Sequence, residues 1–373
     1  MSKHFKIFSF FSGSGFLDLG FEKNGFDIEF VNEFSPAFIK AYQYSREQMK
    51  MRKPKYGFHN TDINIYLNEE KEKLENYIKQ EKKDGNIVGF IGGPPCPDFS
   101  VAGKNKGRNG DNGKLSLSYV ELIISMKPDF FLFENVKGLW RTTRHREFYD
   151  ELKEKLKKSG YLLTDRLTNA LEYGVPQDRD RILLFGVRKE LVASKSISDL
   201  DWMKYHKYTI EDIKNTNWPG CDKFIKDSKT ECPKDVPKKL TVQYWFDKND
   251  VDNHPNKNDF FKPQQGLAKM KIIEEGDDSR KSYKRLHRWR YSPTAAYGNN
   301  EVHLHPYKER RLSVAEALAI QSLPKEFSLP KDMTLTDKFK TVGNGVPYVM
   351  SSGIAKTIRD YLEENIYDNS NGV

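Results

Sequence analysis

The chain has 373 residues. Since a single hydrophobic core stops growing at about 250–300 residues, this length predicts two domains. Lysine and arginine total 62 against 53 for aspartate and glutamate, so the formal net charge is +9. This excess favours a polyanionic partner over an acidic or apolar one, although basic proteins without such a partner are common.

The cysteines and the apolar residues exclude several further classes of protein. Cys96, Cys221 and Cys232 are an odd number without a Cys-x-x-Cys pair, so neither a disulfide framework nor a zinc site is predicted. The N-terminus lacks the apolar region and cleavage site of a signal peptide, and no apolar run reaches the roughly 18 residues that cross a bilayer. We therefore expect a soluble, intracellular protein.

Short apolar runs recur at residues 6–11, 27–31, 86–91, 129–133 and 181–187, and they predict buried parallel strands. Segments with helical spacing lie between them. Within 145–160, Phe148, Leu152 and Leu156 recur at every fourth position, and Gly160 suits the C-terminal cap. This alternation predicts a doubly wound, Rossmann-like α/β sheet that binds ligands at the carboxyl ends of its strands.

The composition changes between about 200 and 300, where Pro, Asn, Asp and Lys are frequent, and a second, irregular lobe is expected there. Helical pattern returns at 312–324, where Ser313 and Glu316 form a capping box and Pro324 follows the predicted end. Pro347 suits the first turn of a last helix. The apolar face of that helix is predicted to consist of Met350, Ile354, Ile358 and Leu362.

A glycine-rich turn follows the first predicted strand. Gly13 and Gly15 would let the backbone approach a ligand at a helix N-terminus, but Asp18 stands where a dinucleotide-binding fingerprint needs a third glycine. Glu33 ends the second strand, where a carboxylate can accept from both hydroxyls of a ribose, and Asp62 could accept from an adenine amino group. Each acidic residue alone is more often a helix cap or a surface charge.

Cys96 lies among three prolines directly after Gly92 and Gly93, at the end of a buried strand. A lone thiol is most often a small buried apolar group, but this stiff turn would hold a nucleophile in a fixed position. Glu134 ends the next strand, and we expect it beside the cysteine. Burial would raise its pKa and make it a proton donor at neutral pH, whereas a structural cap is the alternative.

Gln177, Arg179 and Arg181 alternate as the chain enters the strand at 181–187, so their side chains are expected on one face. Arginine there would bind a phosphate or orient a carbonyl group. The alternative is an exposed face of ion pairs with Asp178 and Asp180.

With Cys96, Glu134 and the Gln177-x-Arg179-x-Arg181 set in this order, the chain resembles the cytosine-C5 DNA methyltransferases outside about 200–280. The stretches similar to the motifs of that family are FFSGSGF (10–16), NEF (32–34), GGPPCPDFS (92–100), ENVKGL (134–139), NALEYGVPQDRDRILLFGVR (169–188), RRLSVAEALAIQSLP (310–324) and TVGNGVP (341–347).

The resemblance implies S-adenosyl-L-methionine as the cofactor. Phe11 and Phe34 would flank the adenine, and Glu33 would hold the ribose. The other residues that the resemblance places around the cofactor are Gly13, Gly15, Asp62, Ile63, Pro95, Leu115 and Asn344.

The resemblance also implies the chemistry. Cys96 would attack C6 of a cytosine flipped out of the duplex, since C5 is too weak a nucleophile until a thiolate adds at C6. Glu134 would protonate or hydrogen-bond N3, Arg181 would support the base carbonyl, and Arg179 would order the site. The product would be 5-methylcytosine in DNA.

Double-stranded DNA is the implied partner. The basic stretch after Cys96 is expected to close over the DNA backbone, and the target-recognition residues are expected within about 205–310. The residues predicted to contact DNA are Ser100, Lys104, Lys106, Arg108, Gln177, Lys284, Arg285, Arg288 and Arg290. His303 and His305 are interpreted as structural residues and not as metal ligands. The implied domains are a catalytic and cofactor-binding domain at 1–204, a target-recognition domain at 205–330, and a segment at 331–373 that returns to the first.

The chain departs from the family pattern at two places: Pro97 and Asp98 follow the cysteine where Gln is common, and Phe16 replaces a glycine. The favoured interpretation is the modification enzyme of a prokaryotic restriction-modification system, a cytoplasmic monomer on the nucleoid with a cognate restriction endonuclease. A transfer-RNA cytosine methyltransferase, which usually has Thr where this chain has Ser100, and a non-catalytic DNA-binding relative are the alternatives.

Overall fold

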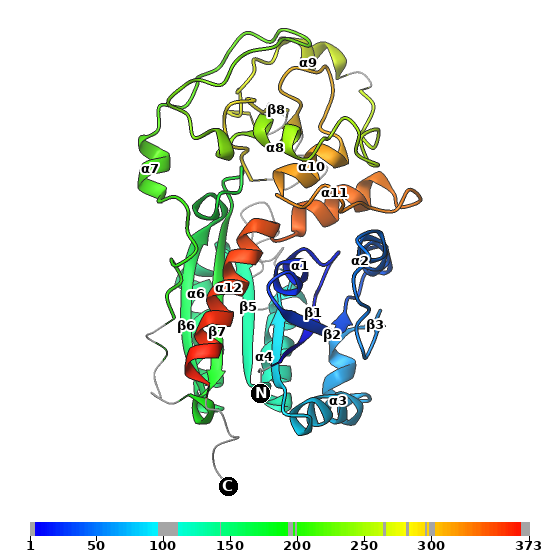
Figure 1. The fold of residues 1–373 in the computed structure, drawn as a ribbon, viewed down its shortest axis with the longest axis vertical. Helices are drawn as coiled ribbons and strands as arrows, with labels where there is room; N and C mark the ends of the chain where they lie inside the picture. The colour runs from blue at the N-terminus through cyan, green and yellow to red at the C-terminus, as the bar shows by residue number, and fades with distance from the viewer. Residues whose placement is uncertain are drawn as a thin grey trace.

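The computed structural model describes residues 4–95, 111–141, 143–192, 197, 200–263, 266–280, 283–294, 297 and 303–366. Figure 1 shows a lower part built around one sheet and an upper part made mostly of irregular chain. The sheet has seven strands in the order β3-β2-β1-β4-β5-β7-β6. Its strands are β1 Phe5–Phe10, β2 Phe26–Asn32, β3 Phe58–His59, β4 Ile87–Gly92, β5 Phe130–Val136, β6 Tyr161–Asn169 and β7 Asp180–Arg188.

The strands β1, β2, β4 and β5 are parallel, as their apolar runs predicted, and β3, which was not predicted, is parallel to β2. β7, in contrast, is antiparallel to both β5 and β6. The prediction of a parallel strand at 181–187 is therefore wrong. The reason is that β6, which is only partly buried and was not recognised, connects to β7 through residues 170–179, too few for a crossover helix. The reversal matters because β7 begins at the edge of the sheet where the parallel strands end.

Helices cover both faces of the sheet, which confirms the doubly wound α/β class (Figure 1). On one face, α1 (Phe16–Glu22) and α12 (Tyr348–Asn365) pack against strand residues such as Ile7 and Ile28. On the other face, α3 (Lys71–Lys83), α4 (Asp111–Met126) and α6 (Thr143–Lys158) pack against residues such as Phe8 and Phe90. The remaining helix of this part is α2 Pro36–Gln48, and its short segments are η1 Ile63–Leu67, α5 Gly138–Arg141, η3 Ala170–Tyr173 and η4 Lys189–Leu191.

Two of the predicted helices, at 145–160 and after Pro347, are present as α6 and α12. The stripe of α6 is buried, and Gly160 follows its end with a φ of +96°, the left-handed conformation that favours glycine. Pro347 is the N-cap of α12, one residue earlier than expected. The predicted apolar face of α12, which consists of Met350, Ile354, Ile358 and Leu362, is fully buried.

The upper part contains little regular structure, as its composition predicted. Within the described ranges its only sheet pairs two residues of β8 (Lys284–Arg285) with two of β9 (His303–Leu304). Its helical segments are α7 Ile210–Asn215, η5 Lys238–Leu240, α8 Val242–Lys248, α9 Leu267–Ile272, α10 Val314–Ile320 and α11 Leu335–Asn344. The capping box of Ser313 and Glu316 begins α10, as predicted. None of the described helices combines the length and the apolarity that a membrane span requires.

The two parts are joined where the chain approaches β7. Ser292 donates its backbone N–H to the carbonyl of Pro176 at 2.8 Å, and Asp178 donates its own to the carbonyl of Ser292 at 2.9 Å. The Thr294 hydroxyl donates to the Asp178 carbonyl at 2.6 Å. A segment of the upper part is thus hydrogen-bonded to the chain that carries Gln177 and Arg179.

Ile354→Ala should test the contribution of α12 to the core. Because Ile354 is fully buried between α12 and the sheet, its truncation should lower the free energy of unfolding by about 2–5 kcal/mol. Glu364→Ala, at an exposed position of the same helix, should change it by less than about 0.5 kcal/mol. Urea denaturation measures both, and equal losses would contradict this packing.

Candidate active site

The turn after β1 has an unusual backbone. Phe11, Gly13 and Gly15 have φ angles of 51°, 56° and 77°, and Gly15 is the N-cap of α1. A Cβ on Gly15 would lie 2.5 Å from the ring of Tyr42, so glycine is required there by space as well as by conformation. This turn places the N-terminus of α1 at the carboxyl edge of the sheet.

Glu33 connects this turn to the end of β2. Its carboxylate accepts the backbone N–H of Gly13 at 2.8 Å and that of Ser35 at 2.8 Å. Burial raises the pKa of Glu33, and these backbone donors oppose the rise. The next residue, Phe34, has 71% of its surface exposed, so its ring is largely uncovered. An anchored carboxylate and an uncovered aromatic ring therefore lie side by side.

Asp62 and Ile63 lie next to Glu33 and Phe34. The Asn60 side chain donates to the carbonyls of Glu33 at 2.9 Å and Phe34 at 2.8 Å. Asp62 caps η1 by accepting the backbone N–H of Asn64 at 2.8 Å, so the ordinary role of a helix cap is present. Ile63 is buried. Three segments predicted to bind the cofactor thus meet at one edge of the sheet.

The other predicted cofactor residues are less informative. Asn344 is exposed at the end of α11, Leu115 is half-buried on α4, and Pro95 is exposed at the end of a described range. Phe11 meets the ring of Tyr119 edge-on at 5.9 Å.

Glu134 lies within β5 and is 8% exposed. Its Oε1 accepts from Nε of Arg181 at 2.7 Å. Burial raises the pKa of Glu134, and the charges of Arg181 and Arg179 oppose the rise. A Cβ on Gly93 would lie 2.5 Å from Oε2, so the second oxygen lies against the backbone of the turn that leads to Cys96. Glycine at position 93 is needed for this close approach.

Gln177 and Arg179 are also buried, so the alternative of an exposed ion-pair face is wrong. Arg179 donates from Nη2 to the carbonyl of Gly343 at 2.7 Å and from Nη1 to Oε1 of Gln177 at 3.4 Å. Burial lowers the pKa of Arg179. Through Gly343, Arg179, which directly precedes β7, is bonded to the last turn of α11, which also contains Asn344.

Cys96 and the four DNA-contact candidates that follow it in the sequence lie outside the described residues. The described range that precedes Cys96 ends at Pro95, close to Glu134. The side chain of Asn135, the neighbour of Glu134, donates to the Pro94 carbonyl at 3.5 Å. The four candidates are Ser100, Lys104, Lys106 and Arg108.

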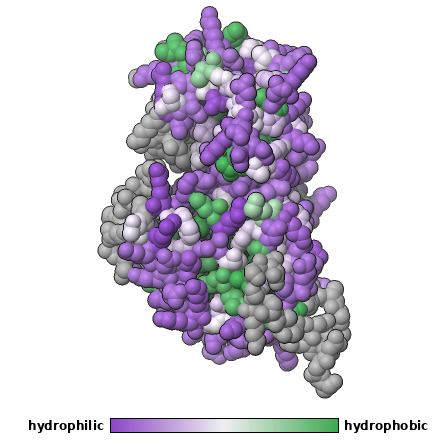
Figure 2. All heavy atoms as spheres, turned by 90° about the vertical axis from the view of Figure 1, so that its left-hand side faces the viewer, coloured by the Kyte–Doolittle hydropathy of each residue, from purple (hydrophilic) through white to green (hydrophobic). Residues whose placement is uncertain are grey.

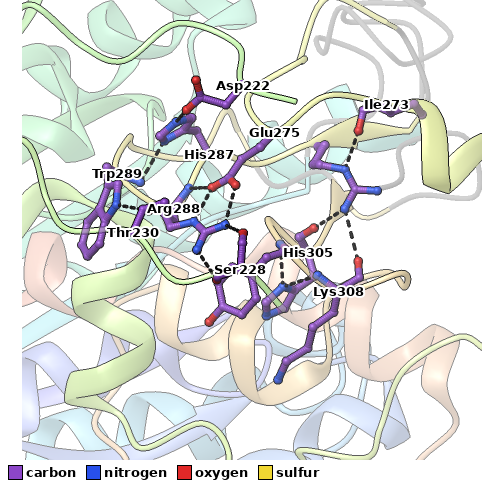
Figure 3. Close-up of polar contacts among 12 residues, drawn as sticks. Asp222, Ser228, Thr230, Ile273, Glu275, His287, Arg288, Trp289, His305 and Lys308 are labelled. Atoms are coloured by element: carbon purple, nitrogen blue, oxygen red, sulfur yellow. Dashed lines mark hydrogen bonds and ion pairs between the residues drawn. The ribbon is translucent and has the colours of Figure 1, made fainter. Parts of the chain in front are cut away.

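Arg285 was predicted to contact DNA, but it is fully buried. Its Nε donates to the Ile273 carbonyl at 2.8 Å, and Nη1 donates to the carbonyls of His305 at 2.5 Å and Lys308 at 3.2 Å (Figure 3). Its guanidinium lies 3.8 Å from the centre of the Phe224 ring. Burial lowers the pKa of Arg285 to about 10.

Arg288 is likewise buried, and it pairs with Glu275 at 2.6 Å and donates to the hydroxyl of Ser228 at 2.7 Å (Figure 3). Neither guanidinium group is exposed at the protein surface, where it could contact DNA, so the prediction is wrong for both. The guanidinium groups of Arg285 and Arg288 bond to residues of several loops, and so hold together a part of the molecule whose described residues form almost no sheet. Lys284 and Arg290 are half-exposed and remain candidates.

His303 and His305, which the sequence interpretation made structural, are both buried, and burial lowers the pKa of each to about 3. Nδ1 of His305 accepts the backbone N–H groups of Tyr307 at 3.3 Å and Lys308 at 3.2 Å. No group of His, Cys, Asp and Glu within the described ranges has the arrangement of a metal site.

Phe16, the residue that departs from the family pattern, has a structural explanation. Its ring meets Phe327 edge-on at 5.1 Å, and a Cβ on Gly345 would lie 2.1 Å from it. The hydroxyls of Ser14 and Thr341 are 2.7 Å apart. The first turn is therefore packed against α11 and the residues that follow it.

Asp18 was not predicted to have a role, yet it lies buried beneath the same turn. It accepts from the Ser9 hydroxyl at 2.9 Å and the Tyr42 hydroxyl at 3.0 Å. Arg46 donates to the Gly15 carbonyl at 2.7 Å and lies 4.3 Å from the centre of the Tyr42 ring. Burial raises the pKa of Asp18 to about 7. In the sequence, the feature that could have drawn attention to Asp18 is that it stands where a dinucleotide-binding fingerprint has its third glycine.

Comparisons with known proteins agree with this geometry. Residues 5–360 match the family model for C-5 cytosine-specific DNA methylase. The chain is 58% identical over 360 residues to Type II methyltransferase M.NmeDI of Neisseria meningitidis serogroup C, covering 96% of this chain and 84% of that protein. It is 31% identical to Type II methyltransferase M.FnuDI of Fusobacterium nucleatum, covering 96% and 95%.

Solved structures show the same fold at low identity. A DNA modification methyltransferase encoded within an E. coli prophage aligns with a TM-score of 0.63 at 20% identity, covering 96% of this chain and 99% of that one. A DNMT2 mutant from Spodoptera frugiperda aligns with a TM-score of 0.56 at 17% identity, covering 96% and 100%.

The doubly wound seven-stranded sheet has the fold of S-adenosylmethionine-dependent methyltransferases. The chain belongs to the family of C-5 cytosine-specific DNA methylases. It is a DNA (cytosine-5)-methyltransferase that uses S-adenosylmethionine as methyl donor and DNA as substrate. The residues fit the cofactor, because Glu33 offers acceptors for ribose hydroxyls and Phe34 offers a face for a purine.

Asp18→Asn should change the pH dependence of stability. The raised pKa means that the folded protein binds the Asp18 proton between the unfolded value of 3.8 and about 7, so stability from this group falls as pH rises through that range. Between pH 5 and 8 the wild type should lose up to about 3 kcal/mol more than the variant. Urea denaturation at both pH values measures this difference. Asp84→Asn, at an exposed position, is the control, and a variant with the wild-type pH dependence would contradict the assignment.

Proposed function

We propose that Cys96 is the nucleophile and that Glu134 is the acid beside it. The buried Glu134–Arg181 pair next to Gly93 carries this proposal, because it lies where the chain turns toward Cys96. The Cys96 thiolate adds to C6 of the target cytosine, and C5 becomes nucleophilic. S-adenosylmethionine supplies the methyl group to C5. Loss of the C5 proton and of the thiolate then gives 5-methylcytosine.

Glu134 is suited to act on N3 of the base. Since burial raises its pKa, a larger fraction is protonated at neutral pH than for an ordinary glutamate. Arg181 holds Oε1 and fixes the orientation of the carboxyl group, and we assign it to the base carbonyl as well. Arg179 orders the site through Gly343.

The cofactor site that we propose follows the edge formed by β1, β2 and η1. Glu33 binds the ribose, Phe11 and Phe34 flank the adenine, and Asp62 accepts from its amino group. The supporting residues are Gly13, Gly15, Ile63, Pro95, Leu115 and Asn344.

We also propose the division into a catalytic domain at 1–204, a target-recognition domain at 205–330 and a returning segment at 331–373. Lys284 and Arg290 remain the described candidates for DNA contact, whereas Gln177 is fully buried, like Arg285 and Arg288. The names of the relatives support a role as the modification enzyme of a type II restriction-modification system, and we propose that role. We further propose that a cognate restriction endonuclease accompanies the enzyme. The enzyme would act in the cytoplasm as a monomer on the DNA of the nucleoid.

The Cys96 assignment is tested by transfer of labelled methyl groups to duplex DNA and to bulk tRNA. We expect 5-methylcytosine in DNA with the wild type and none with Cys96→Ala, because without the thiolate C5 stays unreactive. Mass analysis of the nucleosides identifies the product. Label confined to tRNA would contradict the DNA role, and full activity of Cys96→Ala would contradict the nucleophile.

Glu134→Gln should reduce the maximal rate by about 10²–10⁴-fold, because an amide keeps the shape but cannot give a proton to N3. Single-turnover methyl transfer measures the rate, and calorimetric titration with S-adenosylmethionine should show unchanged affinity. Glu151→Gln, on α6, is the control. A Glu134→Gln variant as fast as the wild type would exclude this role.

A further inference from the structure

The last turn of α11 contacts three different parts of the molecule. In Figure 1, α11 lies between α10 of the upper part and α1 and α2 of the lower part. Thr341, Val342 and Gly343 in this turn are all buried, and we call these three residues the junction turn. Since successive residues of an α-helix are rotated by about 100°, three neighbours in one turn face three directions.

Thr341 contacts the glycine turn that we assign to the cofactor. Its hydroxyl lies 2.7 Å from that of Ser14, and both residues are buried. Ser14 stands between Gly13 and Gly15, the N-cap of α1. The Gly13 N–H is bonded to Glu33, the proposed ribose ligand, at 2.8 Å. One hydroxyl pair therefore connects the junction turn to the backbone that would lie against the cofactor.

Gly343 contacts the proposed base site. Its carbonyl accepts from Nη2 of Arg179 at 2.7 Å, and Arg179 is buried. Burial raises the pKa of Glu134, and the charges of Arg181 and Arg179 oppose the rise. A shift of the Gly343 carbonyl would therefore move a guanidinium group whose charge acts on the proposed acid.

Val342 contacts the upper part of the molecule. Its carbonyl accepts from Nε2 of Gln321, the C-cap of α10, at 2.5 Å. Around the junction turn, one apolar cluster joins α1, α10 and α11, and it includes Phe16, Leu19, Val314, Leu318 and Val342. On the face that Figure 2 shows, hydrophilic residues predominate and apolar areas are small, so this cluster is covered on that side. Because close-packed interiors transmit strain, a displacement at one contact of the junction turn affects the others.

We propose that Thr341 is a positioning residue that couples the cofactor turn to the base site. Its hydroxyl fixes the junction turn against Ser14, and the Gly343 carbonyl then fixes the guanidinium group of Arg179. The inference rests on the proposed function, in which the glycine turn binds the cofactor and Arg179 orders the base site. A cofactor on the glycine turn stabilises the contacts that also hold Arg179, so cofactor and DNA should each raise the affinity for the other.

Three variants test this role. Thr341→Val removes the hydroxyl and keeps the shape of the side chain, whereas Thr341→Ser keeps the hydroxyl. Thr357→Val is the matched control, because this threonine is also buried but its hydroxyl donates to the Gly353 carbonyl at 3.1 Å within α12. Urea denaturation compares the stability that the two valine variants lose.

Fluorescence anisotropy measures the affinity for a duplex that contains a cytosine the enzyme methylates, with and without S-adenosylhomocysteine, which lacks the methyl group. This cofactor analogue should tighten DNA binding by about 5-fold or more in the wild type, Thr341→Ser and Thr357→Val. In Thr341→Val the effect should fall below about 2-fold, because the glycine turn no longer holds the junction turn. The proposal is overturned if the wild type shows no such coupling, if Thr341→Val keeps it, or if Thr341→Ser or Thr357→Val loses it equally.

Methyl transfer separates this inference from the proposed function. With saturating cofactor and DNA, Thr341→Val should lower the single-turnover rate by about 10-fold, because Arg179 is less well placed. Calorimetric titration without DNA should give an affinity for S-adenosylmethionine within about 2-fold of the wild type, since Glu33 and Phe34 are unchanged. If the wild type itself transfers no methyl group to DNA, the proposed function fails. If the wild type is active and Thr341→Val is equally fast, only this inference fails.

Discussion

The ion pair between Glu134 and Arg181 depends on the direction of one strand. Because β7 runs antiparallel to β5, its first residues lie at the edge where β4 and β5 end, and Arg181 lies opposite Val136 in the register. A parallel β7 would place the same arginine at the far end of the sheet. Burial raises the pKa of Glu134 although the charge of Arg181 opposes the rise, and Gly93 leaves space for the second carboxyl oxygen. The position and protonation of the proposed acid follow from this arrangement.

The cofactor edge is held from both ends of the chain. Glu33 bonds to the Gly13 turn from β2, and the Asp18, Tyr42 and Arg46 cluster supports the turn from below. The ring of Phe16 fills the space beside Gly345. The bulky side chain at position 16, where glycine is common, is therefore accommodated by the absence of a side chain at position 345. This packing explains how the turn keeps its shape.

Much of the fold could be predicted because buried strands are continuous apolar runs and because α6 and α12 have clear helical spacing. β6 was missed because its residues are only partly buried and do not form such a run. Without β6, β7 was wrongly predicted to be parallel. The glycine turn, Glu33 and Glu134 were found from their places after strands. Arg285 and Arg288 were misassigned because sequence alone does not distinguish a buried guanidinium that bonds carbonyls from one that contacts phosphate. Long-range contacts such as Phe16 with Gly345 leave no local pattern.

The central claim is that the thiolate of Cys96 attacks the base beside Glu134. A duplex with 5-fluorocytosine at the methylated position tests it directly, because fluorine at C5 cannot leave as the proton does and the adduct cannot resolve. After incubation with S-adenosylmethionine and proteolysis, mass spectrometry should find the modified nucleotide on the peptide that contains Cys96. An adduct on a different residue, or methyl transfer to ordinary cytosine without any adduct on the fluorinated duplex, would contradict the account.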